Sequence, residues 1–191
     1  MSQADREKWD TRYREGSYKA RTHPTELLVE WLPKLPRGRA LDAASGAGRN
    51  SLYLAAAGYQ VDALDISRVA LDRLRATADA RGLEVNCTEM DLESDPLPTQ
   101  HYDLIVMVRY TSAALITRLL PLLADGGHFL CEEHLETDED VIGPSDPAFR
   151  MAPNELRELA NGLRLLSYSE SIVEDPGGRR AALAQLVACR S

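Results

Sequence analysis

The chain alternates short apolar runs with segments whose apolar residues recur at helical spacing. The apolar runs predict strands at 39–44, 60–65, 83–88, 102–108, 127–133, 163–171 and 181–190. The segments between them predict helices at 49–57, from the N-cap Ser67 to Gly82, at 112–124 and at 153–161. This alternation is typical of an α/β protein with a doubly wound, mostly parallel sheet of seven strands and helices on both faces.

Both ends of the chain depart from the alternation. Residues 175–178, Asp-Pro-Gly-Gly, connect the last two predicted strands over a span that only antiparallel neighbours allow, so we expect the last strand to be antiparallel. The segment before the first strand places four apolar residues on one helical face, namely Leu27, Leu28, Trp31 and Leu32. We expect one domain over 1–191, with an N-terminal helical cap at 1–35 and a ligand-binding core at 36–191.

The composition of the chain limits the kinds of molecule that we expect it to bind. The formal net charge is -8 and the pI is near 5.0, whereas binding to nucleic-acid phosphates requires a basic face, so we expect a small-molecule partner and no nucleic acid. The start of the chain has no apolar signal core, and no apolar run approaches the ~20 residues of a membrane span, which favours a cytoplasmic protein. Cys87, Cys131 and Cys189 lack metal-ligand spacing, so we expect buried free thiols and no metal site.

A glycine turn follows the first predicted strand. Gly46 and Gly48 allow a tight turn and a close approach of the backbone to a ligand. Asp65 ends the next strand, where a carboxylate accepts hydrogen bonds from both hydroxyls of a ribose. The alternative for Asp65 is a local role at the start of the following helix. The pattern predicts an adenosine-containing ligand.

Two residues beside the glycines distinguish between adenosine cofactors. A dinucleotide motif has a third glycine three residues after the second, and here that residue is Ser51. Asp42 lies just before the turn, where its carboxylate repels a pyrophosphate and attracts an amino group. These residues favour the amino-acid end of S-adenosylmethionine. Asp42 serving only to cap the turn is the alternative.

Four segments, in this order, resemble the class I S-adenosylmethionine-dependent methyltransferases, and more narrowly the small single-domain enzymes of the tellurite-resistance and thiopurine types. They are the glycine motif Leu41–Gly48, the ribose strand Val61–Ser67, the adenine turn Glu89–Leu92 and the fourth strand Tyr102–Val108. The resemblance covers nearly the whole chain and implies a Rossmann-like fold. The first motif departs from the family, because Ala44 stands where family members usually have glycine. Ala44 is strained if the turn requires a positive φ there.

The resemblance implies S-adenosylmethionine as cofactor and S-adenosylhomocysteine as product. The cofactor contacts that we expect are Trp9, Arg12, Asp42, Ala43, Gly46, Gly48, Asp65, Ile66, Asp91, Leu92 and Val108. Asp91 would face the adenine amine and the backbone of Leu92 the ring edge, with a simple turn as the alternative for Asp91. Trp9, Arg12 and Tyr13 would close over the cofactor, or else only pack the cap helix.

Methyl transfer from a sulfonium is an in-line displacement, in which the enzyme mainly positions the acceptor and excludes water. Arg109 and Tyr110 follow the fourth strand, where ligands of open α/β sheets bind, and we expect them to contact the acceptor as catalytic residues. The alternative is a solvated arginine and a half-buried tyrosine. His134 is a candidate base, with an inert histidine as the alternative. The acidic loop 134–152 would favour neutral or cationic acceptors, unless it is only a solvated loop.

Three functions remain open from the sequence. The first is methyl transfer to a small-molecule acceptor. The second is a catalytically silent protein that binds S-adenosylmethionine. The third is a nicotinamide-dependent oxidoreductase, which Asp42 and Ser51 disfavour.

Overall fold

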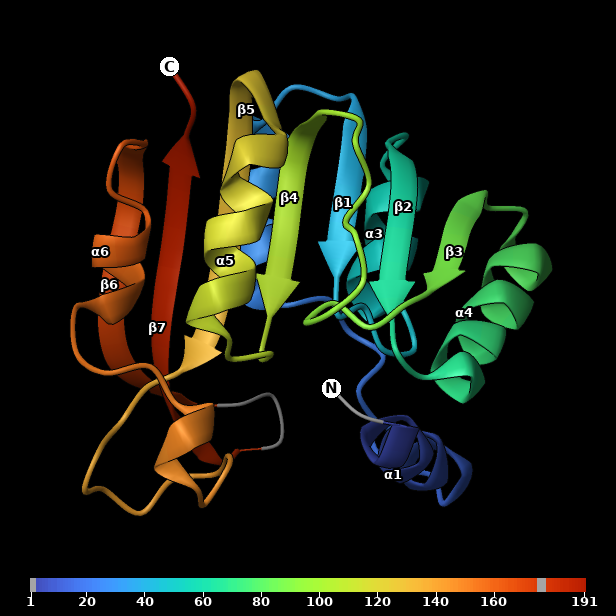
Figure 1. Ribbon diagram of the computed structural model, residues 1–191, viewed down its shortest axis with the longest axis horizontal. Coiled ribbons are helices and arrows are strands. Elements are labelled where there is room, and N and C mark those ends of the chain that lie inside the picture. Colours follow the sequence, from blue (N-terminus) through green and yellow to red (C-terminus); the bar gives the residue numbers. More distant parts are fainter. Residues whose placement is uncertain (1–2, 175–177) are drawn as a thin grey trace.

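The computed structural model describes residues 3–174 and 178–191 and contains one sheet in the order β3-β2-β1-β4-β5-β7-β6 (Figure 1). The strands are β1 Arg39–Ala43, β2 Gln60–Asp65, β3 Val85–Glu89, β4 Tyr102–Val108, β5 Leu123–His134, β6 Arg164–Glu174 and β7 Arg180–Cys189. β1 to β5 pair in parallel, and β7 lies antiparallel between β5 and β6. The predicted seven-stranded sheet with a reversed last strand is confirmed, although most of the predicted turn at 175–178 lies outside the described residues.

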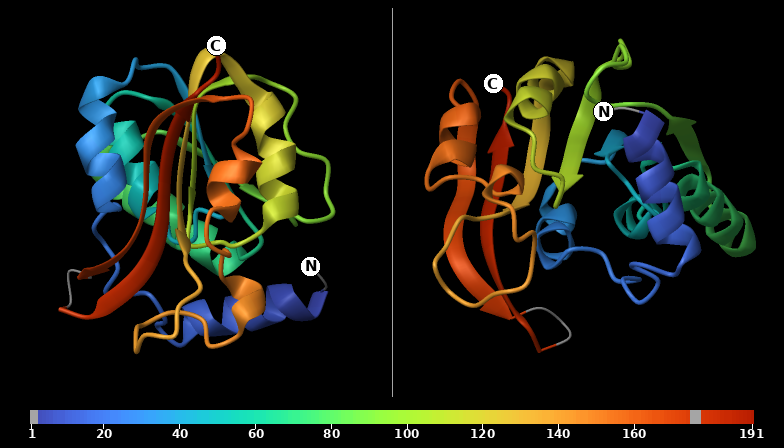
Figure 2. Two further views of the ribbon diagram at one scale, coloured as in Figure 1. Left: turned by 90° about the vertical axis from the view of Figure 1, so that its left-hand side faces the viewer. Right: turned by 60° about the horizontal axis from the view of Figure 1, so that its bottom comes forward.

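Helices cover both faces of the sheet. They are α1 Gln3–Arg14, α2 Glu26–Trp31, α3 Arg49–Ala56, α4 Arg68–Arg81, α5 Ala113–Leu119 and α6 Glu155–Leu159. The left panel of Figure 2 views the sheet nearly edge-on, with α2 and α3 on one side and α5 and α6 on the other. α4 packs beside α3 through Leu71 and Leu74, which contact Leu52.

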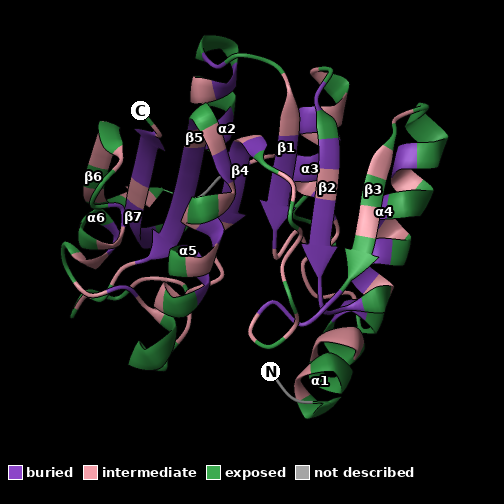
Figure 3. Cartoon of the chain, turned by 45° about the horizontal axis from the view of Figure 1, so that its top comes forward, coloured by how far each residue is buried: buried purple, intermediate pink, exposed green. Residues whose placement is uncertain are grey.

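The central strands are buried from both sides. Along β4, Ile105 and Met107 pack toward α5 and α6, whereas Leu104 and Val106 pack toward α2 and α3. All four side chains are fully buried, which explains why this strand is continuously apolar rather than alternating (Figure 3). The sheet therefore forms a rigid platform whose strand ends hold their positions.

Local signals placed α4 correctly. The Ser67 hydroxyl accepts a hydrogen bond from the Ala70 amide at the start of the helix, and Gly82 ends it in the left-handed conformation at φ 64°.

Some boundaries differ from the prediction. The helix predicted at 112–124 ends at Leu119, because the missing amide hydrogen of Pro121 favours a short 3-10 turn at Leu120–Leu122. β5 then begins at Leu123, before the predicted start at 127. β3 begins at Val85 instead of 83, and α6 is shorter than 153–161.

Two α-helices, α1 and α2, precede the first strand, and they differ in role. α2 buries Leu27 and Leu28 against the sheet. α1 buries Tyr13 and lies beyond the carboxyl ends of the parallel strands (Figure 1). In the described part of the chain, no helix has the length and apolar character that crossing a membrane requires.

The three cysteines are unpaired. Cys131 and Cys189 are buried, as predicted, whereas Cys87 lies near the sheet edge on β3 and is only half-buried.

Candidate functional site

The carboxyl ends of the parallel strands meet at one edge of the sheet, between α1 and the loop that follows β5 (Figure 1). This edge brings together every predicted cofactor residue of the core. Ala43 ends β1, Asp65 ends β2 and is followed by Ile66, and Val108 ends β4. Ala43 and Ile66 are buried, and Val108 is half-buried. Topology therefore assembles the site from segments that are far apart in sequence.

The glycine turn requires left-handed backbone at three residues. φ is 57° at Ala44, 54° at Gly46 and 80° at Gly48. A Cβ at Gly48 would lie 2.2 Å from Leu74 Cδ1, so packing as well as φ requires glycine there. At Ala44 the strain that the sequence suggested is present, because an alanine occupies a conformation that glycine adopts freely.

Asp42 is enclosed at the end of β1. Its side chain is 1% exposed, and its Oδ2 accepts a hydrogen bond of 2.5 Å from the Ser51 hydroxyl. Burial raises the pKa of Asp42 to about 6. Hydrogen bonds from Ser51 and the positive charge of Arg49 act in the opposite direction and lower this pKa, but burial is the larger effect. At neutral pH the carboxylate is charged but poorly solvated, and an ammonium group could compensate this charge.

Asp65 links β2 to the glycine turn. Its Oδ2 accepts a 2.7 Å hydrogen bond from the Gly46 amide, and its Oδ1 accepts one of 2.8 Å from the Ser67 amide. Burial raises the pKa of this carboxyl group. Each carboxylate oxygen has a second lone pair, so the same group can accept from ribose hydroxyls while it holds the turn.

Asp91 organises the turn after β3. Its carboxylate accepts 2.9 Å hydrogen bonds from the Glu93 amide and from the Ser94 hydroxyl. The Arg118 side chain donates to the carbonyl oxygens of Leu92 and Glu93 and fixes the turn against α5. The turn-forming role that the sequence left open for Asp91 is therefore present, and Leu92 is buried beside it.

α1 is attached to this edge by contacts that sequence reasoning missed. Asp10 Oδ1 accepts hydrogen bonds from the Ser67 hydroxyl, at 2.7 Å, and from the Val69 amide, at 3.2 Å. A Cβ at Gly46 would lie 2.4 Å from the Tyr13 hydroxyl oxygen, so Tyr13 lies directly over the glycine turn. An acidic residue between two aromatic residues of a helix gives no sequence signal for such a distant partner.

Trp9 and Arg12 lie on the same helix but farther from the turn. The Arg12 guanidinium lies 5.2 Å from the ring centroid of Trp9, a cation–π contact. Trp9 is half-buried and its ring lies 6.3 Å from that of Tyr18, whereas Arg12 is exposed. In this arrangement both residues stabilise the cap, and cofactor contact by either stays a prediction.

Arg109 is fixed by a buried partner. Its Nε lies 3.2 Å from Glu132 Oε1, and its amide donates to the Glu132 carbonyl oxygen at 2.7 Å. Glu132 is 2% exposed and also accepts hydrogen bonds from the Thr25 hydroxyl at 2.5 Å and the Gln185 amide at 2.9 Å. Arg109 adopts φ 58°, a strained value for a non-glycine residue.

Tyr110 turns toward the other side of β4. Its hydroxyl donates a 2.9 Å hydrogen bond to Glu93 Oε1, and burial followed by the charge of Glu93 raises the pKa of Tyr110. The hydroxyl is therefore protonated at neutral pH. Arg109 and Tyr110 stand at the predicted edge, and their contact with an acceptor stays a prediction.

Two further residues at the end of β5, Glu133 and His134, have buried ionisable side chains. Glu133 is fully buried, accepts a 3.2 Å hydrogen bond from Thr111 and has its pKa raised by burial to about 8. His134 is 6% exposed, and its Nδ1 has no partner among the described residues. Glu132, Glu133 and His134 form a run of ionisable residues at the end of an apolar strand, which is the signal that could have identified the two glutamates.

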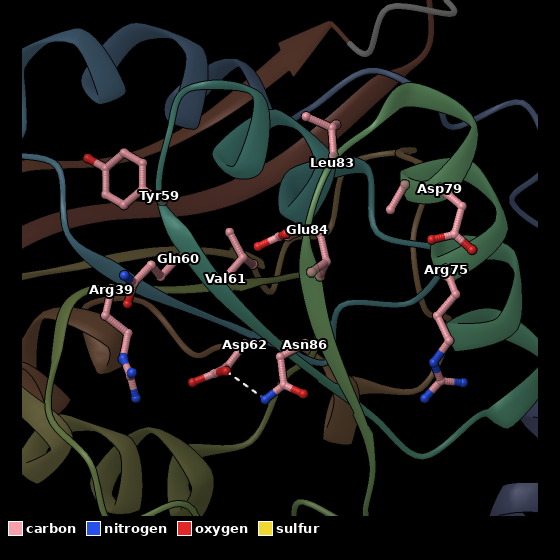
Figure 4. A pocket seen from close by; sticks show the side chains of 12 residues that line it. Arg39, Tyr59, Gln60, Val61, Asp62, Arg75, Asp79, Leu83, Glu84 and Asn86 are labelled. Carbon is pink, nitrogen blue, oxygen red and sulfur yellow. Dashed lines mark hydrogen bonds between the residues drawn. The ribbon is translucent and has the colours of Figure 1, made fainter.

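A separate hollow of about 490 Å³ lies at the opposite end of the sheet (Figure 4). It is formed at the amino ends of β2 and β3 and the carboxyl end of α4, and Asp62 and Asn86 are joined across it by a 2.8 Å hydrogen bond. The hollow is therefore not part of the candidate cofactor site, which lies at the carboxyl ends of the strands. Within residues 3–174 and 178–191, no group of three or more His, Cys, Asp or Glu side chains could hold a metal ion.

Comparison with known proteins agrees with the motifs. Residues 40–127 match a family model described as a methyltransferase domain. The probable S-adenosyl-L-methionine-dependent methyltransferase TehB of Haemophilus influenzae is 29% identical over 153 residues, which cover 74% of this chain and 53% of TehB. The chain thus spans about half the length of this curated relative.

Solved structures show the same fold. The crystal structure of TehB from Haemophilus influenzae has a TM-score of 0.76 and 26% identity, over 94% of this chain and 66% of that one. The magnesium protoporphyrin IX methyltransferase ChlM from Synechocystis PCC 6803, crystallised with bound SAH, has a TM-score of 0.66 and 20% identity, over 86% of this chain and 80% of ChlM. Motif order, the methyltransferase-domain match over residues 40–127 and the fold agree, and together they support a class I S-adenosylmethionine-dependent methyltransferase that resembles TehB.

Proposed function

We propose that this protein binds S-adenosylmethionine and transfers its methyl group to a small-molecule acceptor. The observation that carries the proposal is the enclosed Asp42 carboxylate beside a glycine turn. Its Oδ2 is fixed by Ser51, and its raised pKa reflects a buried charge that an ammonium group would compensate. A pyrophosphate would be repelled by the same carboxylate, which disfavours a nicotinamide cofactor.

The residues of this edge also fit the rest of the cofactor. Positive φ at Gly46 and Gly48 keeps the turn free of side chains, and Asp65 presents a carboxylate to a ribose. Bound S-adenosylmethionine supplies an activated methyl group. The chain would then position the acceptor and exclude water, with Tyr13 above the turn and Arg109 and Tyr110 on the acceptor side.

Calorimetry with S-adenosylmethionine and with S-adenosylhomocysteine tests cofactor binding. We expect saturable binding of both ligands, weakened in Asp42→Asn and unchanged in Asp138→Asn, a matched change at an exposed residue of the loop after β5. The proposal fails if neither ligand binds at millimolar concentration. Tight binding of NADH in the same experiment would instead support an oxidoreductase.

Transfer itself requires a second measurement. Cofactor carrying a labelled methyl group is incubated with the protein and with thiol, amine, hydroxyl and oxyanion acceptors, and we expect label in at least one class. A protein that binds the cofactor and methylates none of them is a catalytically silent binding protein, and the catalytic part of the proposal is then wrong.

A further inference from the structure

One threonine hydroxyl faces two hydrogen-bond acceptors just after β4 ends. Thr111 Oγ1 lies 3.2 Å from Glu133 Oε2 and 3.0 Å from the Phe149 carbonyl oxygen. Glu133 lies near the end of β5, and Phe149 ends the 3-10 turn Pro147–Phe149 in the loop after β5. The hydroxyl therefore lies between the sheet and the loop that borders the candidate site.

A threonine hydroxyl carries one proton, so it makes a full hydrogen bond to only one of these acceptors at a time. A charged Glu133 can only accept, and it takes the proton because hydrogen bonds to ionised acceptors are the stronger ones. A protonated Glu133 instead donates its own O–H to Thr111 Oγ1, and the Thr111 hydroxyl then donates to Phe149. The two short distances can therefore both be full hydrogen bonds only when Glu133 carries a proton.

The immediate surroundings of Glu133 favour its protonated form at neutral pH. The side chain is fully buried, and burial raises its pKa to about 8. Hydrogen bonds from the Tyr110 amide and the Thr111 hydroxyl lower this pKa, whereas the charge of Glu132 raises it further. Cys131 Sγ lies 3.8 Å from Glu133 Oε1, and burial raises the pKa of this thiol, so it stays protonated and uncharged.

The helices and the strand that pack around Glu133 contribute mainly apolar side chains. β7 places Ala184 opposite Glu133. Cys131 and Glu133 share the face of the sheet that α5 and α6 cover with Leu115, Ile116, Leu119, Leu156 and Ala160. Of the charged residues on these helices, Arg118 donates to the carbonyl oxygen of Asp95, and Glu155 accepts from the Ala152 amide. Arg157 and Glu158 are exposed.

The charged groups of the neighbouring loops are also directed elsewhere. Arg109, after β4, pairs with Glu132, and Arg150 donates to the carbonyl oxygens of Pro144 and Leu135. The His134 ring is neutral at pH 7, because burial, followed by the charges of nearby arginines, lowers its pKa to about 4. The acidic residues of the loop are exposed, namely Glu136, Asp138, Glu139, Asp140 and Asp146.

The peptide group between Phe149 and Arg150 depends directly on Thr111. Its carbonyl oxygen accepts from the Thr111 hydroxyl, and its amide donates to the Pro147 carbonyl oxygen at 2.9 Å within the 3-10 turn. The next amide, that of Met151, donates to the His134 carbonyl oxygen at 2.7 Å and attaches the loop to β5 independently. Loss of the Thr111 contact would therefore loosen the turn and leave the Met151 attachment in place.

We propose that the proton on Glu133 controls how the loop after β5 is held. With the proton present, Thr111 binds the loop at Phe149. When the proton passes to solvent, the Thr111 hydroxyl donates to the Glu133 carboxylate, and the turn Pro147–Phe149 is released. Thr111 directly follows Tyr110, which the proposed function places on the acceptor side, so release as the pH rises would loosen that side of the site. The switch requires no cofactor and is independent of the proposed function.

Amide hydrogen exchange of the loop, measured residue by residue by NMR, tests the switch. Each rate is divided by that of an unstructured peptide at the same pH, which gives a protection factor. In the wild type, protection of the Phe149 and Arg150 amides should fall about fivefold between pH 6.5 and pH 9, because the turn loses one hydrogen bond. The Met151 amide is the internal control, and its protection should fall less than that of the two turn amides.

Four variants assign the pH dependence to this pair of residues. Thr111→Val removes the donor, so the turn amides should show the low protection at both pH values. Glu133→Gln keeps an N–H donor toward Thr111 at every pH, so they should show the high protection at both. Thr111→Ser keeps the hydroxyl and should behave like the wild type. Glu136→Gln, at an exposed acidic residue of the same loop, is the matched control and should keep the wild-type profile.

Three results would overturn the switch. The first is constant protection of the Phe149 and Arg150 amides from pH 6.5 to pH 9 in the wild type. The second is an equal loss at Met151, which would indicate general loosening of the loop. The third is a decline in Glu133→Gln as steep as that of the wild type, which would assign it to another group. The first two require no substitution, and thermal unfolding verifies that each variant is folded.

Discussion

The Ser51 hydroxyl donates a 2.5 Å hydrogen bond to Asp42 Oδ2, which joins the first turn of α3 to the end of β1. A dinucleotide motif has glycine at this position for close packing of helix and strand. Here the side chain orients the carboxylate instead. Ser51, which stands where a dinucleotide motif has glycine, therefore also orients the Asp42 carboxylate that we assign to the cofactor ammonium.

Neutralising Asp42 should weaken cofactor binding and stabilise the free protein. The pKa of Asp42 is raised from 3.8 to about 6, so its favourable contribution is complete below pH 3.8 and is lost as pH rises through 6. At pH 7 this corresponds to about 3 kcal/mol. We expect Asp42→Asn to raise the free energy of unfolding in urea by about 1–3 kcal/mol.

The same titration predicts the pH dependence of binding. Wild-type affinity for S-adenosylhomocysteine should fall about tenfold per pH unit below pH 6, because Asp42 must lose a proton to pair with the ammonium. Asp42→Asn should bind more weakly at pH 7 and show no such decline. Parallel pH profiles for the two proteins in calorimetry would contradict the assigned contact.

Ala44→Gly should stabilise the protein. Ala44 holds φ 57°, which costs an L-residue about 1–2 kcal/mol, and the greater freedom of glycine in the unfolded chain offsets part of the gain. We expect the free energy of unfolding to rise by about 0.5–1 kcal/mol, measured with urea. Ala57→Gly, at the αR C-cap of α3, is the control and should not stabilise. A loss of stability in Ala44→Gly would show that the turn is not strained.

Gly46→Ala should displace α1. The new Cβ would lie 2.4 Å from the Tyr13 hydroxyl oxygen and 3.5 Å from Cζ, so most of the clash is with the oxygen. We expect a loss of about 2 kcal/mol in Gly46→Ala, of which Tyr13→Phe restores part in the double variant. Strictly additive effects in this cycle, measured by urea unfolding, would mean that Tyr13 does not lie over the turn in solution.

Glu133 should make the free energy of unfolding decrease as the pH rises. Burial raises its pKa from 4.5 to about 8, so its contribution is complete below pH 4.5 and is lost as pH rises through 8. Within this window the loss is about 1.4 kcal/mol per pH unit. Glu133→Gln should flatten the profile of unfolding free energy between pH 5 and pH 8, whereas the exposed-site variant Glu136→Gln should keep the wild-type slope. Equal slopes in all three proteins would contradict the raised pKa.

Features encoded within a few residues were predictable from the sequence. Ser67 and Gly82 mark the ends of α4 through their own hydroxyl and backbone conformation, so no distant partner was needed. The order of the glycine turn and Asp65 likewise follows from one βαβ unit. The end of α5 was misplaced because leucines continue through Pro121 into β5, and hydrophobic periodicity alone does not separate helix from strand there.

Features that depend on distant partners were not predictable. Glu132 pairs with Arg109, the residue that follows the neighbouring strand β4, and accepts a hydrogen bond from Thr25, which is 107 residues away in sequence. Each of these residues in isolation is an ordinary polar position. The parallel register of β4 and β5, which places Val108 opposite Glu132, brings the charges of Arg109 and Glu132 together.

The attachment of α1 to α4 through Asp10 has a practical consequence for spectroscopy. The chain has two tryptophans. Trp9 is sensitive to the position of α1, because it directly precedes Asp10, whose carboxylate attaches the helix to Ser67. Replacing Trp31 with phenylalanine would leave Trp9 as the single tryptophan of the chain. Its emission would then report in real time whether the first helix stays in place as ligands arrive and depart.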